Sequence, residues 1–312
     1  LKVHYSTQRG PVRAVDDVSF GVRAGESLGL VGESGCGKTT IALALLRVMP
    51  ENGVIAGGQV LLDGVDLVQL SEQQMEAQRG QKISMVFQAA MNCLDPVYRV
   101  GDQIVEAIQA HEDTAYEPAF ARARELFGLV GLDEPLLQRY PHEYSGGMRQ
   151  RAVIAMALAC SPRVIIADEP TTALDVLVQD RILKELRRIQ TERKMGMIYI
   201  SHDIGVVAEM SDLVGVMYGG WLIELGPVAE VFAKPRHPYT AALLASVPSV
   251  GGEKRPLRSL PGEPPDLVNV GAGCPFAPRC PSVTDICRRQ RPPPGGTSRH
   301  WALCWHPVSG GQ

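Results

Sequence analysis

The chain has 312 residues, of which 45% are hydrophobic and 21% charged, and its formal net charge is -3. This apolar fraction suffices for a large core and excludes an intrinsically disordered chain. The slight acidic excess disfavours a protein that holds nucleic acid by neutralising phosphates, so we expect no nucleic-acid partner. The longest apolar run, residues 152–160, is about half of the roughly 18 residues that cross a bilayer, so we expect a cytoplasmic chain.

Short apolar runs alternate with amphipathic patterns before residue 245. This alternation predicts an α/β fold with a parallel sheet, whose functional residues gather at the carboxyl ends of the strands. The patterns predict buried strands at residues 28–32, 164–167 and 197–200, and helices at residues 39–49 and 101–111.

The composition changes near residue 245. Twelve of the 23 prolines lie at or beyond Pro248, in a segment with little helical or strand periodicity. We therefore predict a folded domain over residues 1–245, with a helical subdomain at about 95–150, and an extension over residues 246–312.

A phosphate-binding motif follows the first predicted strand. Residues 32–39 match G-x-x-x-x-G-K-[ST], whose glycines let successive backbone N–H groups cradle phosphates beside a helix N-terminus. In this P-loop, Lys38 supplies charge to the β and γ phosphates and the Thr39 hydroxyl ligates Mg²⁺. A glycine-rich turn that binds nothing is disfavoured, because strand, motif and helix follow in order. The predicted nucleotide contacts are Gly32, Ser34, Gly35, Cys36, Gly37, Lys38, Thr39 and Thr40.

Two acids follow the second predicted strand. Asp168 has the place of a carboxylate that holds Mg²⁺, and Glu169 that of a base that orients or polarises the attacking water. Paired acids after a strand are otherwise a solvated strand end. The P-loop favours the first interpretation.

Further motifs resemble those of the ATPases of ABC transporters. Residues 144–151 (Tyr-Ser-Gly-Gly-Met-Arg-Gln-Arg) resemble the family's signature sequence, with Tyr where Leu is usual. Residues 170–175 resemble its D-loop, Gln88 resembles its Q-loop glutamine and His202 its switch histidine. The order and spacing of these motifs match over about residues 1–245.

The resemblance implies a P-loop ABC-type nucleotide-binding domain with a RecA-like parallel sheet core, an antiparallel β subdomain and a helical subdomain. Residues 145–147 should begin a helix, whose exposed N–H groups form an anion site. In this family the signature of one subunit completes the P-loop site of another, so ATP joins a head-to-tail dimer. Beyond the P-loop, the implied residues are Ser145, Gly146, Gly147, Asp175 and Tyr5 for nucleotide, Gln88 with Thr39 and Asp168 for Mg²⁺, and Glu169, His202 and Gln88 for catalysis.

Tyr5 resembles the aromatic residue that stacks on adenine in this family. A tyrosine near the N-terminus is as often a strand residue without a role in binding, and the sequence leaves both interpretations open.

The carboxyl end resembles one branch of the family. Residues 237–240 (His-Pro-Tyr-Thr) and 273–281 (Gly-Cys-Pro-Phe-Ala-Pro-Arg-Cys-Pro) look like the tail of oligopeptide and dipeptide uptake ATPases. The branch also includes nickel and some oligosaccharide importers, and these solutes stay open. The resemblance implies a peripheral ATPase on the cytoplasmic face of the inner membrane. Its implied partners are a second ATPase subunit, a homologue or an identical copy, two membrane permeases and, indirectly, an extracytoplasmic solute-binding protein.

Two other classes of ABC ATPase are disfavoured. ATPases of DNA repair insert coiled coils or zinc modules, and ribosomal ones carry two ATPase units in tandem, whereas this sequence shows neither feature. Exporters commonly fuse the ATPase to membrane spans, and no span is predicted here.

Four of the 7 cysteines lie in the last forty residues, at Cys274, Cys280, Cys287 and Cys304. Four thiolates hold zinc tetrahedrally or a cubane iron-sulfur cluster, and these gaps are wider than those of zinc knuckles. The resemblance implies a [4Fe-4S] cluster, while zinc and unliganded thiols stay open. Because the cluster would lie far in the sequence from Lys38 and Glu169, we expect no redox step in transport. We expect Cys280→Ser to loosen the tail and to leave nucleotide binding largely intact.

Overall fold

The chain folds into two compact units, each built from segments that are distant in the sequence. The computed structural model describes residues 1–87, 93–171, 175–246 and 260–308. The first unit comprises Leu1–Gly21, Leu28–Val68 and Ile200–Gln312, and the second comprises Val22–Ser27 and Gln69–Tyr199.

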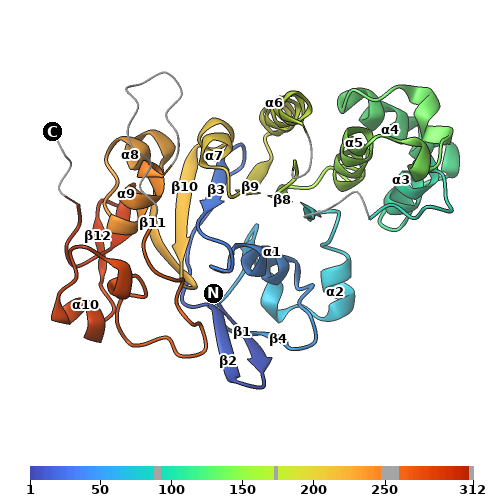
Figure 1. Cartoon of the computed structure of the whole chain (residues 1–312). Coiled ribbons are helices and arrows are strands. Elements are labelled where there is room, and N and C mark those ends of the chain that lie inside the picture. Colours follow the sequence, from blue (N-terminus) through green and yellow to red (C-terminus); the bar gives the residue numbers. More distant parts are fainter. Residues whose placement is uncertain (88–92, 172–174, 247–259, 309–312) are drawn as a thin grey trace. The chain divides into compact units, whose positions relative to one another are not determined.

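The first unit combines β-sheets with helices (Figure 1). Its strands are β1 (Lys2–Thr7), β2 (Gly10–Val15), β3 (Ser27–Val31), β4 (Gly53–Gly57), β5 (Leu61–Leu62), β6 (Val65–Asp66), β10 (Leu213–Tyr218), β11 (Trp221–Pro227), β12 (Pro294–Gly296) and β13 (Trp301–Leu303). Its helices are α1 (Lys38–Leu46), α7 (Ile204–Met210), α8 (Val228–Ala233), α9 (Pro238–Ala245) and α10 (Asp285–Arg289).

Strands β12, β13, β11, β10 and β3 pair in that order. β10 runs parallel to β3, with Leu213 opposite Leu28, and antiparallel to β11. All residues of β3 are buried, which is the pattern of a strand covered on both faces. A Cβ at Gly29 would lie 2.2 Å from a side-chain carbon of Val207 in α7, so this glycine lets the helix pack directly on the strand.

A second sheet has the order β2-β1-β4, with antiparallel pairing throughout. Tyr5 on β1 lies opposite Val12 on β2 and Gly53 on β4. This sheet confirms the expected antiparallel β subdomain.

The extension is more ordered than its composition predicts. β13 pairs with the edge of β11 through Trp301 and Ala302, and β12 pairs with β13. Such short strands carry little local signal, because the edge that they pair with determines them. The extension therefore belongs to the same compact unit as β3. The division into an ATPase domain over 1–245 and an extension over 246–312 stays a prediction.

The second unit contains parallel strands and a helical cluster. β7 pairs in parallel with β8, Ile83 lying opposite Val164, and β9 follows on the other side of β8. Helices α3, α4 and α5 pack against one another (Figure 1, green). The helices and strands of the second unit are α2 (Glu72–Glu76), β7 (Ile83–Val86), α3 (Val100–Gln109), α4 (Tyr116–Leu129), α5 (Gly146–Ala157), β8 (Val164–Asp168), α6 (Val176–Arg193) and β9 (Gly196–Ile200).

These elements confirm the α/β fold. The helices expected at 39–49 and 101–111 are α1 and α3, and α3 buries Ile104, Val105 and Ile108 on one face, as its spacing predicts. In the part of the chain that the structure describes, no helix is long and apolar enough to span a bilayer.

Candidate functional site

The P-loop joins β3 to α1, as the sequence predicts. Gly32 has φ 149°, and a Cβ there would lie 2.2 Å from the Met217 carbonyl oxygen. Gly37, the residue before α1, has φ 108°, and its Cβ would lie 2.2 Å from the Ala14 carbonyl oxygen. Both positions therefore require glycine, and they turn the backbone toward the N-terminus of α1.

Lys38 lies over this loop and is 8% exposed. Its Nζ donates hydrogen bonds to the carbonyl oxygens of Gly32, at 2.7 Å, and Glu33, at 3.1 Å. It also contacts the Cys36 thiol, whose burial raises its pKa, so the thiol stays neutral near pH 7. A bound phosphate would compete with the two carbonyls for the ammonium.

Tyr5 lies beside the start of α1. Its hydroxyl is 3.3 Å from Thr40 Oγ1, and its ring packs on Gly53, where a Cβ would lie 2.8 Å from a ring carbon. Thr39 is exposed in the first turn of α1. Tyr5 is thus close to the P-loop helix, while its stacking on adenine stays a prediction.

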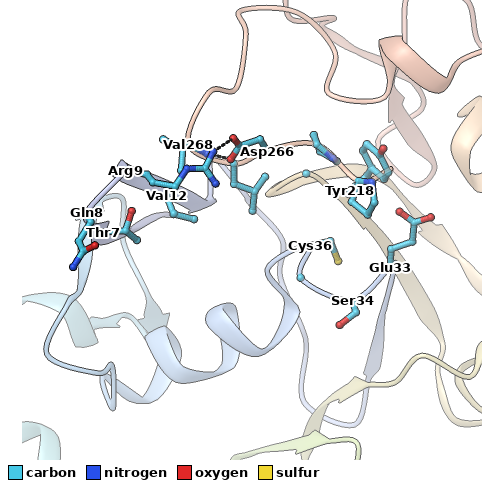
Figure 2. A pocket seen from close by; sticks show the side chains of 15 residues that line it. Thr7, Gln8, Arg9, Val12, Glu33, Ser34, Cys36, Tyr218, Asp266 and Val268 are labelled. Atoms are coloured by element: carbon cyan, nitrogen blue, oxygen red, sulfur yellow. Dashed lines mark hydrogen bonds and ion pairs between the residues drawn. The ribbon is translucent and has the colours of Figure 1, made fainter. Parts of the chain in front are cut away.

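A pocket of about 650 Å³ opens beside the P-loop (Figure 2). Its walls are residues 33–36 of the P-loop, the tip of the β1–β2 hairpin and residues 264–268 of the extension. Arg9 and Asp266 form an ion pair at 2.5 Å across it, and the Arg13 N–H donates to the Leu267 carbonyl oxygen at 3.0 Å. Sequence reasoning missed residues 264–268, because more than 200 residues separate them from the P-loop.

The predicted acids lie at the end of β8 in the second unit. Asp168 is its last residue and is 1% exposed. Glu169 follows with φ 46°, in the left-handed region that residues other than glycine seldom occupy. Strain of this kind clusters at functional sites.

The signature residues begin α5, and this expectation is confirmed. Ser145 caps the helix, its Oγ accepting a hydrogen bond from the Met148 N–H at 3.3 Å. Gly146 and Gly147 form the first turn, and a Cβ at Gly147 would lie 2.8 Å from a Val178 side-chain carbon. The unusual Tyr144 is buried, and its hydroxyl donates to the Leu136 carbonyl oxygen at 2.6 Å.

The remaining predicted residues are spread over both units. Asp175 caps α6 and accepts a hydrogen bond from the Val178 N–H at 2.9 Å. His202 follows β9 in the first unit and is exposed. Gln88 lies outside the described residues. The catalytic, nucleotide and Mg²⁺ roles of all these residues stay predictions.

The four tail cysteines line one cavity of about 20 Å³, together with His237 and His306. Burial and the neighbouring thiols raise the pKa of Cys274 to about 12 and that of Cys304 to about 11. The Nε2 atom of His237 lies 3.9 Å from Cys274 Sγ. Among the described residues, however, no group of three or more His, Cys, Asp or Glu is spaced to hold a metal ion.

Comparisons with known proteins agree with this geometry. A family model described as "ABC transporter" matches residues 15–172. The chain belongs to the ABC transporter family. A second model, described as "Oligopeptide/dipeptide transporter, C-terminal region", matches residues 223–287 of this ABC ATPase.

Relatives align with this ABC ATPase over nearly its whole length. A probable peptide ABC transporter ATP-binding protein of Sinorhizobium fredii is 46% identical, covering 98% of this chain and 92% of that protein. The oligopeptide transport ATP-binding protein OppD of Salmonella typhimurium is 43% identical, and the match covers 99% of this chain and 92% of that protein. The dipeptide transport ATP-binding protein DppD of Bacillus subtilis is 43% identical, and the match covers 98% of this chain and 92% of that protein.

A solved structure shares the fold of this ABC ATPase. It is the ATP-binding cassette MJ0796, dimeric in a post-hydrolysis state and bound to ADP and Pi. The TM-score is 0.66 at 26% sequence identity, and the match covers 73% of this chain and 96% of that one. The likeness supports ATP hydrolysis by this chain.

Proposed function

We propose that this chain is the ATP-hydrolysing subunit of an ABC importer that takes up oligopeptides or dipeptides. The observation that carries the ATPase role is the P-loop, where Gly32 and Gly37 hold backbone geometry that a Cβ would block. The match of residues 223–287 to the oligopeptide/dipeptide region and the relatives' names support the transport role.

The tasks of hydrolysis are divided among the predicted residues. The Lys38 ammonium, which donates to the carbonyl oxygens of Gly32 and Glu33, would turn from them to the β and γ phosphates, beside the N–H groups of residues 34–37. The Glu169 carboxylate orients water and takes its proton as it attacks the γ phosphate. By the family resemblance, His202 and Gln88 would sense or orient the γ phosphate and the water.

The donor set also fits Mg²⁺. The resemblance assigns Mg²⁺ to the Thr39 hydroxyl, the Asp168 carboxylate and Gln88, whose side chains all carry oxygen, the ligand atom that this hard cation prefers. Thr39 is exposed in the first unit, Asp168 is buried in the second, and Gln88 lies outside the described residues. When bound, Mg²⁺ neutralises phosphate charge as the γ phosphate leaves.

A second ATPase subunit is the expected partner of residues 145–147 and Asp175. The capped N-terminus of α5 offers exposed N–H groups to a phosphate. Next to Asp175, Val176 and Leu177 are 80% and 83% exposed, which leaves two large apolar side chains for a partner to cover. We propose a head-to-tail dimer in which this face meets the P-loop of a homologous subunit or an identical copy.

Membrane permeases are the other partners. Val97 and Tyr98 are 71% and 59% exposed and precede the first helix of the α3–α5 cluster. This apolar pair supports contact with a permease at the cytoplasmic face of the inner membrane, where the chain would lie as a peripheral protein. An extracytoplasmic solute-binding protein would act through the permeases.

Uptake by cells separates the candidate solutes. Cells that lack the gene should lose uptake of labelled di- and oligopeptides, and the parent gene should restore it, while Lys38→Ala should not. Unlabelled peptide should compete, whereas nickel or an oligosaccharide should not. If nickel or an oligosaccharide competed and unlabelled peptide did not, peptides would not be the solute.

We also propose that the tail binds a [4Fe-4S] cluster with a structural role. The four thiols line one small cavity, and thiolates are the ligands that iron-sulfur clusters and zinc take. Burial raises the pKa of Cys274 and Cys304, with a smaller contribution from the neighbouring thiols, and a bound cation would favour their thiolate forms. His237 accepts a hydrogen bond from the Tyr239 N–H at Nδ1, so its Nε2 carries the proton, and this N–H lies near Cys274 Sγ. When bound, the cluster would cross-link the chain.

Metal analysis of anaerobically purified protein tests the tail. We expect a brown protein with about four iron atoms per chain, and Cys280→Ser should be colourless. Cys160→Ser is a matched control, because that buried thiol lies in the second unit. One zinc per chain would favour a tetrahedral site, and absence of metal would contradict both.

A further inference from the structure

The extension contacts the P-loop through a partly buried ion pair. Arg279 donates from Nη1 to Glu33 Oε2 at 2.8 Å and from Nη2 to Glu33 Oε1 at 3.0 Å. The side chains are 6% and 25% exposed. A two-point pair between planar groups is among the stronger and more directional side-chain contacts.

Both partners are held by further contacts. Arg279 also donates to the Tyr218 hydroxyl at 3.0 Å and, from Nε, to the Pro261 carbonyl oxygen at 2.8 Å. The Glu33 N–H donates to the Tyr239 hydroxyl at 3.0 Å. Side chain and backbone of this P-loop residue are thus fixed by groups outside the loop.

Glu33 is an unfavourable residue beside a phosphate site. It follows Gly32 directly and lines the same pocket as Ser34, Gly35 and Cys36. Figure 2 shows its carboxylate turned toward Tyr218. Without Arg279 this negative charge would stand next to the phosphates that Lys38 binds, and like charges repel strongly in a partly buried site.

We infer that Arg279 is a positioning residue for nucleotide binding: it neutralises Glu33 and turns its carboxylate away from the phosphate site. Nucleotide affinity thereby depends on the extension being seated. Since Arg279 lies between Cys274 and Cys280, the cysteine cavity and the P-loop are joined by a few residues. The inference rests on the proposed role of the P-loop as the ATP site.

A double-mutant cycle on the full chain tests this. Binding of MgATP is measured by calorimetry for the parent, Arg279→Gln, Glu33→Gln and the double variant. Arg279→Gln should bind about tenfold to a hundredfold more weakly, the range for one uncompensated charge near a phosphate. The double variant should return to within about threefold of Glu33→Gln, because the charge that repels phosphate is then absent.

Arg291→Gln is the matched control. Arg291 also joins the extension to the rest of the first unit, with its guanidinium carbon 4.0 Å from the Trp221 ring centroid and Nη1 3.8 Å from Asp16 Oδ2. Neither of these contacts involves a P-loop residue. The affinity of Arg291→Gln for MgATP should therefore stay within about twofold of that of the parent. In the assembled transporter, Arg279→Gln should raise KM for ATP and leave kcat within about threefold of the parent, since a binding contact is lost.

Equal affinity of Arg279→Gln and the parent would overturn the inference. A double variant as weak as Arg279→Gln would overturn it too, because displaced packing and not charge would then cause the loss. Lys38→Ala separates the two proposals: if it binds ATP as the parent does, the proposed ATP site is wrong, whatever Arg279 does.

Discussion

Phe276 anchors the extension, and Phe276→Ala should release it. The ring is 1% exposed and lies edge-on to Tyr218 and Tyr239, with centroids 5.2 and 5.4 Å away. Truncating a buried phenylalanine of this kind costs about 3 to 5 kcal/mol. At about 1.4 kcal/mol per tenfold, the population of the released extension should rise roughly 10²- to 4 × 10³-fold.

Limited proteolysis with trypsin measures this release. At low protease concentration, cleavage follows the population of the open form. Mass spectrometry should therefore show cleavage after Arg288 and Arg289 accelerated by about that factor. Phe120→Ala is the control, since its half-buried ring stacks on the exposed Tyr116 in the second unit. Equal cleavage rates for Phe276→Ala and the parent would refute the anchoring role.

Two further perturbations separate the dimer face from the tail. Gly146→Asp puts a carboxylate at the N-terminus of α5, where the partner's γ phosphate would bind. Size-exclusion chromatography should then show no ATP-driven dimer, while the isolated subunit still binds nucleotide. Normal dimerisation would contradict the shared site. Burial lowers the pKa of His237 from 6.5 to about 3, so the stability that its neutral form contributes is present above pH 6.5 and is lost as the pH falls toward 3. Tryptophan fluorescence of the extension should report this loss, and His237→Gln should weaken the dependence on pH in that window; an unchanged profile would show that His237 does not set it.

Local spacing made the P-loop and the signature helix predictable. Gly32, Gly37 and Lys38 work through the backbone of their own segment, and Ser145 caps the helix that it precedes. The motif residues of each structure lie within about ten residues of one another, the range over which turn and cap chemistry acts. The close approach of Met217 to Gly32 and of Ala14 to Gly37 comes from other strands, and the spacing did not predict it.

Contacts between distant segments were not predictable. Arg279 and Glu33 are 246 residues apart, and nothing in the sequence around either residue indicates that the two pair. β13 forms because β11 offers an edge, which no pattern within Trp301–Leu303 encodes. The expectation that Cys280→Ser leaves nucleotide binding largely intact was made without this contact, and the pair between Arg279 and Glu33 gives the tail a physical route to the P-loop.

Turnover of the assembled transporter tests the central claim most directly. Permeases, both ATPase subunits and the solute-binding protein are reconstituted in vesicles, and phosphate release is measured with and without peptide for the parent and Glu169→Gln. The account predicts peptide-stimulated hydrolysis by the parent, and a rate about 10² to 10⁴ lower for Glu169→Gln, with ATP still bound, because a positioned base is lost. Equal rates in the two proteins would contradict the account.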